Sequence, residues 1–199
     1  MSHDPSNGYD AIADDFIAVR SNVGLEIVTA WAEALPDGAA VLDVGAGSGL
    51  PLTAALIAAG LAVSAIDASP NMVAAFKANF PGTEVACEPA ETSPFFNRRF
   101  DGILAVGLLF LLPPKAQRAL IQRLAETLKP DGRLLFSAPW QVVTWDDLLT
   151  GQTSASLGDA DYRCCLEQAG LTVTDTFVDD GSAHYYAARK PASPIPAQP

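Results

Sequence analysis

Three glycines and two acids have the types and the spacing of a site that binds a small ligand. Gly45, Gly47 and Gly49 follow a short apolar stretch, and Asp43 lies two positions before the first of them. Glycine lets the backbone turn sharply and approach a ligand more closely than a Cβ atom would allow. Asp67 comes 18 residues after Gly49, where an acid can accept hydrogen bonds from both hydroxyls of a ribose. The pattern therefore predicts a site for a ligand that contains a ribose.

A strand, a loop and a helix must position these residues. Residues 41–44 are apolar apart from Asp43 and favour a strand that is covered on both faces. Pro51 suits the first turn of a helix, where its missing N–H costs nothing. Residues 63–67 favour a second strand that ends in Asp67. A strand, a glycine loop and a helix in this order are expected to present free backbone N–H groups to a bound molecule.

These residues resemble the class I S-adenosylmethionine-dependent methyltransferases. Asp43 stands where a nicotinamide-binding fingerprint usually carries an apolar residue. The resemblance covers most of residues 9–190. It implies S-adenosyl-L-methionine as the cofactor and an α/β fold with a doubly wound, mostly parallel sheet. The seven strands of that sheet have the order 3-2-1-4-5-7-6, and the last strand is antiparallel.

The resemblance also implies roles for individual residues. The backbone of Gly45, Ala46 and Gly47 would contact the methionine part of the cofactor, and Asp43 would order that loop. Asp67 would bind the ribose hydroxyls. Ala68 and Met72 would flank the adenine. One further implied cofactor contact is Val106, near the carboxyl end of the fourth predicted strand.

One departure from the family pattern affects the adenine site. Residues 89–95 are similar to the family's Asp-Ala-Glu-x-Leu-Pro-Phe stretch, but Pro89 replaces the aspartate. The backbone N–H of Ala90 remains a candidate for adenine N1, with Glu88 or Glu91 for the exocyclic amine. Glu91 also fits an exposed loop acid.

The alternation of elements predicts a single α/β domain. We expect helices near 9–20, 22–35, 51–60, 70–80, 113–128 and 159–169, and strands near 40–44, 62–66, 83–87, 100–107, 133–138, 171–178 and 183–189. Alternating strands and helices indicate a parallel sheet with right-handed crossovers. The turn at 179–182 is too short for a crossover, so the final strand should run antiparallel. Residues 1–38 would form a helical cap over the cofactor site, 39–190 the Rossmann-like domain and 191–199 a disordered tail.

Composition excludes several classes of function. The net charge of −11 argues against nucleic acid as a partner, because nucleic-acid binding needs clustered lysine and arginine. The three cysteines include no Cys-x-x-Cys pair, so no metal site is expected. No apolar run reaches the ~18 residues that span a bilayer, and the N-terminus lacks a signal pattern. We therefore expect a cytoplasmic monomer or homodimer that acts on a small molecule.

Candidate residues for substrate binding and catalysis come from several regions. Tyr9 and Arg20 flank an amphipathic segment that would cap the site, and they could contact the cofactor carboxylate or the substrate; a solvated surface helix fits equally. Trp140, Trp145 and Asp146 lie in a connection that should cross the site, although the tryptophans could also pack on the sheet. His184 could act as a general base with help from Tyr185, and a structural histidine is the alternative.

The function predicted on this basis is in-line methyl transfer to a small-molecule acceptor. A catalytically silent S-adenosylmethionine-binding protein or partner subunit is the first alternative. A nicotinamide-dependent short-chain oxidoreductase is less favoured: Tyr186 and Lys190 match its Tyr-x-x-x-Lys pair, but that pair belongs on a helix and here falls on a predicted strand.

Overall fold

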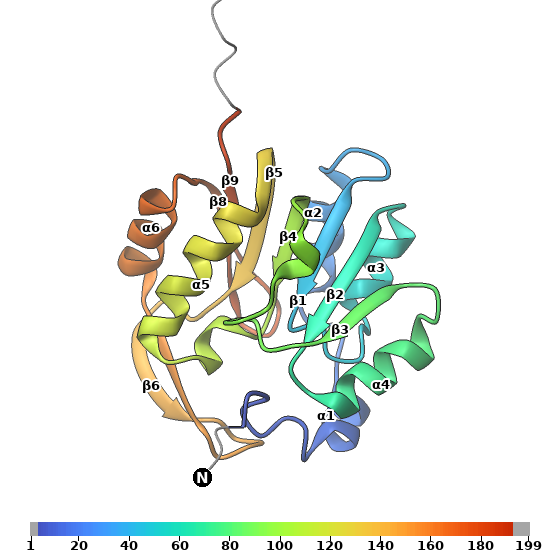
Figure 1. Ribbon diagram of the computed structural model, residues 1–199. Helices are drawn as coiled ribbons and strands as arrows, with labels where there is room; N and C mark the ends of the chain where they lie inside the picture. The colour runs from blue at the N-terminus through green and yellow to red at the C-terminus, as the bar shows by residue number, and fades with distance from the viewer. Residues whose placement is uncertain (1–3, 193–199) are drawn as a thin grey trace, which may run out of the picture.

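The computed structural model, which describes residues 4–192, is built around one twisted seven-stranded sheet (Figure 1). Its strand order is β3-β2-β1-β4-β5-β9-β8, and β9 runs antiparallel to both of its neighbours. Without the separate β6–β7 hairpin, this order is the predicted 3-2-1-4-5-7-6. The predicted fold class is therefore confirmed, including the reversed last strand.

Most of the elements lie where the sequence pattern predicts them. The strands are β1 Ala40–Val44, β2 Ala62–Asp67, β3 Glu84–Cys87, β4 Phe100–Ala105, β5 Leu128–Ser137, β6 Val142–Asp146, β7 Thr153–Leu157, β8 Thr172–Val178 and β9 His184–Arg189. The helices are α1 Ala13–Val19, α2 Leu25–Glu33, α3 Leu52–Ala58, α4 Pro70–Asn79, α5 Pro114–Thr127 and α6 Asp159–Gln168, with short 3-10 turns η1 Phe95–Asn97 and η2 Leu109–Leu111.

Helices cover both faces of the sheet, so β1 and β4 are buried as their continuous apolar runs require. On one face α5 and α6 pack against the sheet around Ile121, Leu124 and Tyr162. On the other face α2 and α3 contribute Val28 and Leu56 to a second core. Figure 1 shows α5 and α6 in front of the sheet and α2 and α3 behind it. The carboxyl ends of β1, β2 and β4 consequently meet at one edge that these four helices leave open.

Two predictions about the elements are wrong. The connection at 139–157 contains the β6–β7 hairpin, with Val142 paired to Leu157 and Asp146 to Thr153. The helix predicted at 9–20 begins only at Ala13 and ends at Val19, whose side chain is exposed. Residues 4–12 instead form successive turns held by hydrogen bonds, such as the one from the Tyr9 N–H to the Ser6 carbonyl.

The expected membrane, metal and tail features can be compared with the described part of the chain. Within residues 4–192, no helix is both long and apolar enough to cross a membrane. The same residues include no group of three side chains arranged to hold a metal ion. The predicted tail at 191–199 lies outside the described residues from position 193 onward.

Candidate functional site

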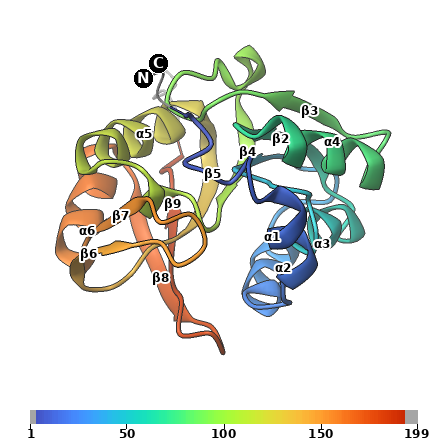
Figure 2. The same ribbon diagram turned by 90° about the horizontal axis from the view of Figure 1, so that it is seen from below.

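A cavity of about 330 Å³ lies at the carboxyl ends of β1, β2 and β4. The N-terminal segment and the β6–β7 hairpin lie over this edge of the sheet, as the view from below shows (Figure 2). Every residue predicted to bind the cofactor lines the cavity, namely Tyr9, Arg20, Asp43, Gly45, Ala46, Gly47, Asp67, Ala68, Met72, Ala90, Glu91 and Val106. Residues from positions 9 to 106 are thus brought to one place by the crossover connections.

The glycine loop points its N–H groups into the protein. The N–H groups of Gly45 and Ala46 both donate to the carbonyl of Ile66, at 2.9 and 3.1 Å. The N–H of Gly47 donates to Asp67 Oδ2 at 2.8 Å. Gly45 and Gly47 need positive φ angles of 74° and 57° to make this turn. The expectation of free N–H groups in the loop is therefore wrong for these three residues, and the loop is poorly suited to a phosphate.

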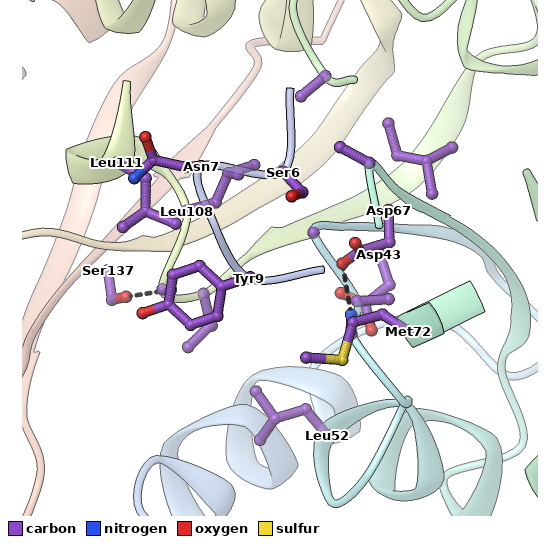
Figure 3. A pocket seen from close by; sticks show the side chains of 18 of the residues that line it. Ser6, Asn7, Tyr9, Asp43, Leu52, Asp67, Met72, Leu108, Leu111 and Ser137 are labelled. Carbon is purple, nitrogen blue, oxygen red and sulfur yellow. Dashed lines mark hydrogen bonds between the residues drawn. The ribbon is translucent and has the colours of Figure 1, made fainter. Parts of the chain in front are cut away.

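Asp67 is held by two backbone donors at the end of β2. Its Oδ2 accepts from Gly47 and its Oδ1 accepts from the Ser69 N–H at 2.8 Å. Burial raises the pKa of this carboxyl, against the lowering effect of the two hydrogen bonds. A carboxylate offers about four lone-pair positions, so capacity remains for hydroxyl donors from a ligand. Figure 3 shows Asp67 beside Asp43 and Met72 on one side of the pocket.

Asp43 is buried in β1 and reaches the first turn of α3. Its Oδ2 accepts a hydrogen bond from Thr53 Oγ1 at 2.6 Å. Burial raises its pKa to about 6, and Asp67 adds to the rise, while the Thr53 hydrogen bond and Arg20 oppose it. Asp43 thus ties strand to helix on either side of the glycine loop, without accepting a loop N–H in the structure.

The turn at 88–95 is fixed by a residue that the sequence analysis did not identify. Arg123 of α5 donates to the carbonyls of Ala90 and Ser93 and lies 4.7 Å from the centre of the Phe95 ring. Ser93 Oγ donates to Glu88 at 2.7 Å. Arg123 therefore positions Ala90 and the acids beside it, which line the cavity.

The N-terminal segment connects the two sides of the cavity mouth. Tyr9 Oη donates to Asp147 Oδ2 in the hairpin turn at 3.1 Å. On the other side, Asp10 Oδ1 accepts from Ser69 Oγ at 2.6 Å and from the Asn71 N–H at 2.9 Å. Residues 9 and 10 thus clasp the hairpin turn to the start of α4, across the site.

Of the five residues predicted to bind substrate or take part in catalysis, one lines the cavity and four do not. Tyr185 lines the cavity, whereas His184, Trp140, Trp145 and Asp146 do not. The His184 ring lies against Trp140, with 5.6 Å between centroids. Trp145 contacts the cavity indirectly, because it packs against Phe110, a lining residue, at 5.5 Å.

Tyr185 and Asp179 form a fixed pair at the far side of the cavity. Tyr185 Oη donates to Asp179 Oδ2 at 2.9 Å, and the Ala183 N–H donates to Asp179 Oδ1 at 2.9 Å. Burial and the neighbouring Asp179 raise the pKa of the Tyr185 phenol, so it stays protonated. A phenol in this state is a hydrogen-bond donor and a poor base.

Several lining residues were not identified as site residues from the sequence. They are Pro5, Ser6, Asn7, Phe16, Val23, Leu108, Phe110, Leu111, Ser137 and Ala183. Ser137 ends β5, and its Oγ accepts from the Gly107 N–H at 2.8 Å (Figure 3). Its position at a strand carboxyl end was the available signal; the N-terminal residues gave no signal of this kind.

The cavity is strongly acidic. Asp43, Asp67, Glu88, Glu91 and Asp179 line it, whereas Arg20 is the one basic side chain among the described lining residues. The inward-turned loop N–H groups add to this preference. The site is therefore suited to a ligand that carries positive charge and a ribose.

Comparisons with known proteins agree with this geometry. Residues 41–132 match the sequence model of a methyltransferase domain family. A segment of 94 residues is 37% identical to an uncharacterised methyltransferase of Mycobacterium tuberculosis. The matched segment makes up 47% of this chain and 37% of that protein. The match thus spans little more than a third of the relative's length.

Solved structures share the fold over almost the whole chain. One is a Burkholderia thailandensis 1,6-didemethyltoxoflavin-N1-methyltransferase with 1,6-didemethyltoxoflavin and S-adenosylhomocysteine bound. It has a TM-score of 0.67 and 22% identity, and the match covers 96% of this chain and 92% of that chain. The CcbJ methyltransferase of Streptomyces caelestis has a TM-score of 0.76 and 15% identity, with 96% of this chain and 100% of that chain covered.

Proposed function

Because this chain carries a class I S-adenosylmethionine-dependent methyltransferase domain, we propose that it transfers the methyl group of S-adenosylmethionine to a small-molecule acceptor. The cofactor supplies an electrophilic methyl group on a positively charged sulfur. The protein has to align the acceptor with that methyl group and exclude water.

The observation that carries this proposal is the polarity of the cavity. S-adenosylmethionine has a cationic sulfonium, an ammonium group and a ribose. Five carboxyl groups line the cavity, and the N–H groups of Gly45, Ala46 and Gly47 are already bonded within the protein. A nicotinamide dinucleotide would need such N–H groups for its pyrophosphate. The same polarity thus argues against the oxidoreductase alternative.

The position of Lys190 also argues against an oxidoreductase. Tyr186 and Lys190 lie at the last strand and beyond its end, not on one helix. Lys190 Nζ donates to the carbonyls of Ala125 and Leu128, at 2.7 and 2.9 Å. The phenol oxygen of Tyr186 is buried without a hydrogen-bond partner among the described residues. The two side chains therefore do not act together in one catalytic site.

We assign the predicted cofactor contacts as follows. Asp67 would accept the ribose hydroxyls, with Ala68 and Met72 beside the adenine and Glu88 or Glu91 near its amine. Arg20 would pair with the carboxylate of the methionine part, and Tyr9 would close the site from above. These roles remain predictions, as do the cytoplasmic location and the monomeric or dimeric state.

Transfer of the methyl group from labelled S-adenosylmethionine to a panel of small amines, alcohols and thiols tests the proposal. We expect labelled product and S-adenosylhomocysteine to form together with at least one acceptor, and the Asp67→Ala variant to be at least tenfold less active at a limiting cofactor concentration. The Asp37→Ala variant is the matched control, because Asp37 is exposed and does not line the cavity.

The alternatives correspond to distinct results. Binding of S-adenosylmethionine without transfer to any acceptor would favour the silent binding protein or partner subunit. Absence of S-adenosylmethionine binding to the folded wild-type protein would reject both readings.

A further inference from the structure

Asp179 lines the cavity but is not among the residues assigned an individual contact with the cofactor. Asp179 lies on the β8–β9 turn, whereas the other four lining acids lie on β1, at the end of β2 or in the turn after β3. Asp179 forms no ion pair within 4.0 Å among the described residues. It therefore lines the site without a direct ion-pair partner, although Arg20 lines the same cavity.

The surroundings of Asp179 hold its carboxylate in one orientation. Each oxygen accepts one hydrogen bond, from Ala183 and from Tyr185, so about two of its four lone-pair positions remain. Gly24 lies directly over the pair, since a Cβ atom there would stand 2.1 Å from Tyr185 Oη. A carboxylate fixed in this way can bind a partner without a large loss of side-chain entropy.

The walls next to Asp179 are largely apolar. Val23 and Ala183 lie next to it in the lining, and Leu108, Phe110 and Leu111 line the side that faces the hairpin. Asp179 and Val23 also line an open groove between α2 and the β8–β9 strands, which adjoins the cavity. The acceptor side thus combines one fixed anion with apolar walls and an open boundary.

We infer that Asp179 determines acceptor specificity and that the acceptor is an amine on an apolar body. This inference rests on the proposed function, because it assigns the acceptor of the same site. A half-buried carboxylate that lines the cavity favours a cationic or hydrogen-bond-donating partner and disfavours a carboxylate ligand, since two like charges in one site repel each other. Arg20, assigned to the cofactor carboxylate, is then neutralised and does not repel the amine.

Methyl transfer to a bound ammonium group requires the loss of one proton from its nitrogen. The bound ammonium loses one proton to water at the open boundary of the site, which frees the nitrogen lone pair and leaves Asp179 a carboxylate. That lone pair forms the N–C bond as the C–S bond breaks and its electrons move to sulfur. Positive charge moves from sulfur to nitrogen, where the carboxylate side of the site stabilises it. The products are a methylated ammonium ion and S-adenosylhomocysteine, with the one released proton in water.

A binding comparison on the protein saturated with S-adenosylhomocysteine tests the inference. The probes are 2-phenylethylamine, 2-phenylethanol and phenylacetate, measured by calorimetry at pH 7. We expect the amine to bind at least tenfold more tightly than the alcohol, and the carboxylate most weakly. In the Asp179→Asn variant the preference for the amine should fall to threefold or less. Asp180→Asn is the control, because this neighbouring acid is exposed and does not line the cavity.

The outcomes separate the two proposals. Failure of the wild type to bind S-adenosylhomocysteine would reject the proposed function. Tight S-adenosylhomocysteine binding with equal affinity for amine and alcohol, or an amine preference that persists in Asp179→Asn, would overturn only the assignment of Asp179. If the variant fails to fold, as judged by loss of S-adenosylhomocysteine binding, the wild-type comparison of the three probes still decides.

Discussion

At the scale of single residues, Asp43 has an ionisation that depends on the fold. It is 4% exposed, and burial raises its pKa from 3.8 to about 6. Between these two values the folded protein binds a proton more tightly than the unfolded chain does. The contribution of Asp43 to stability therefore decreases as the pH rises from about 4 to about 6.

Replacing Asp43 with asparagine should remove this pH dependence. The oxygen of asparagine can still accept the Thr53 hydrogen bond. From pH 4 to pH 7 the wild type should lose stability that Asp43→Asn keeps. The free energy of unfolding of Asp43→Asn minus that of the wild type should therefore increase by up to about 3 kcal/mol. Urea unfolding at a series of pH values measures this difference. A difference that does not change with pH would contradict the raised pKa.

The Asp43 carboxyl also links pH to ligand binding. A bound sulfonium and ammonium favour the ionised carboxyl groups of Asp43 and Asp67, whose pKa values are both raised by burial. The affinity for S-adenosylmethionine should consequently rise as the pH increases through about 6. In Asp43→Asn this rise should be smaller, which calorimetry at pH 5 and pH 7.5 can measure.

At the scale of elements, the local strand–loop–helix unit could be predicted because its signals are adjacent in the sequence. Gly45, Gly47 and Gly49 all have positive φ, and Ser69 caps α4 by accepting the Met72 N–H. The β6–β7 hairpin could not be predicted in the same way, because residues 147–152 carry no two-residue turn signal. Its position depends on contacts such as Trp145 with Phe110.

Gly49 gives a test of how tightly this unit is packed. A Cβ atom at Gly49 would lie 2.5 Å from Phe80 and 2.9 Å from Phe76, at a φ of 80°. Gly49→Ala should destabilise the protein by about 2–4 kcal/mol, from backbone strain and overpacking together. Gly60→Ala is the control, with φ 77° and open space around it, and should cost about 1–2 kcal/mol. Equal losses in urea unfolding would mean that the aromatic contacts are unimportant.

At the scale of the whole molecule, the cavity is closed by segments that are distant in sequence. Tyr9 and Asp147 are 138 positions apart, and no local pattern could have paired them. By contrast, the β8–β9 turn reaches the site for a topological reason, because an antiparallel last strand begins at this edge. The role of Asp179 there depends on its partners, which only the folded arrangement reveals.

The clasp between Tyr9 and Asp147 should control how long a ligand stays bound. Tyr9→Phe removes one hydrogen bond to a charged acceptor at the cavity mouth, which is worth about 1.5–3 kcal/mol at most. We expect S-adenosylhomocysteine to dissociate several times faster, and the free energy of unfolding to fall by no more than this amount. Stopped-flow release measures the rate. Asp147→Asn and the double variant complete a mutant cycle, and full additivity of the two effects would argue against the clasp.

Calorimetric titration of S-adenosylmethionine into the wild type, Asp67→Ala and Asp37→Ala tests directly whether the cavity binds this cofactor. The proposed site predicts micromolar binding to the wild type and to Asp37→Ala, and a loss of at least tenfold, about 1.4 kcal/mol, in Asp67→Ala. Equal affinity in all three proteins would contradict the assignment of Asp67 to the ribose. No binding to the folded wild type, with stabilisation by a nicotinamide dinucleotide instead, would contradict the account as a whole.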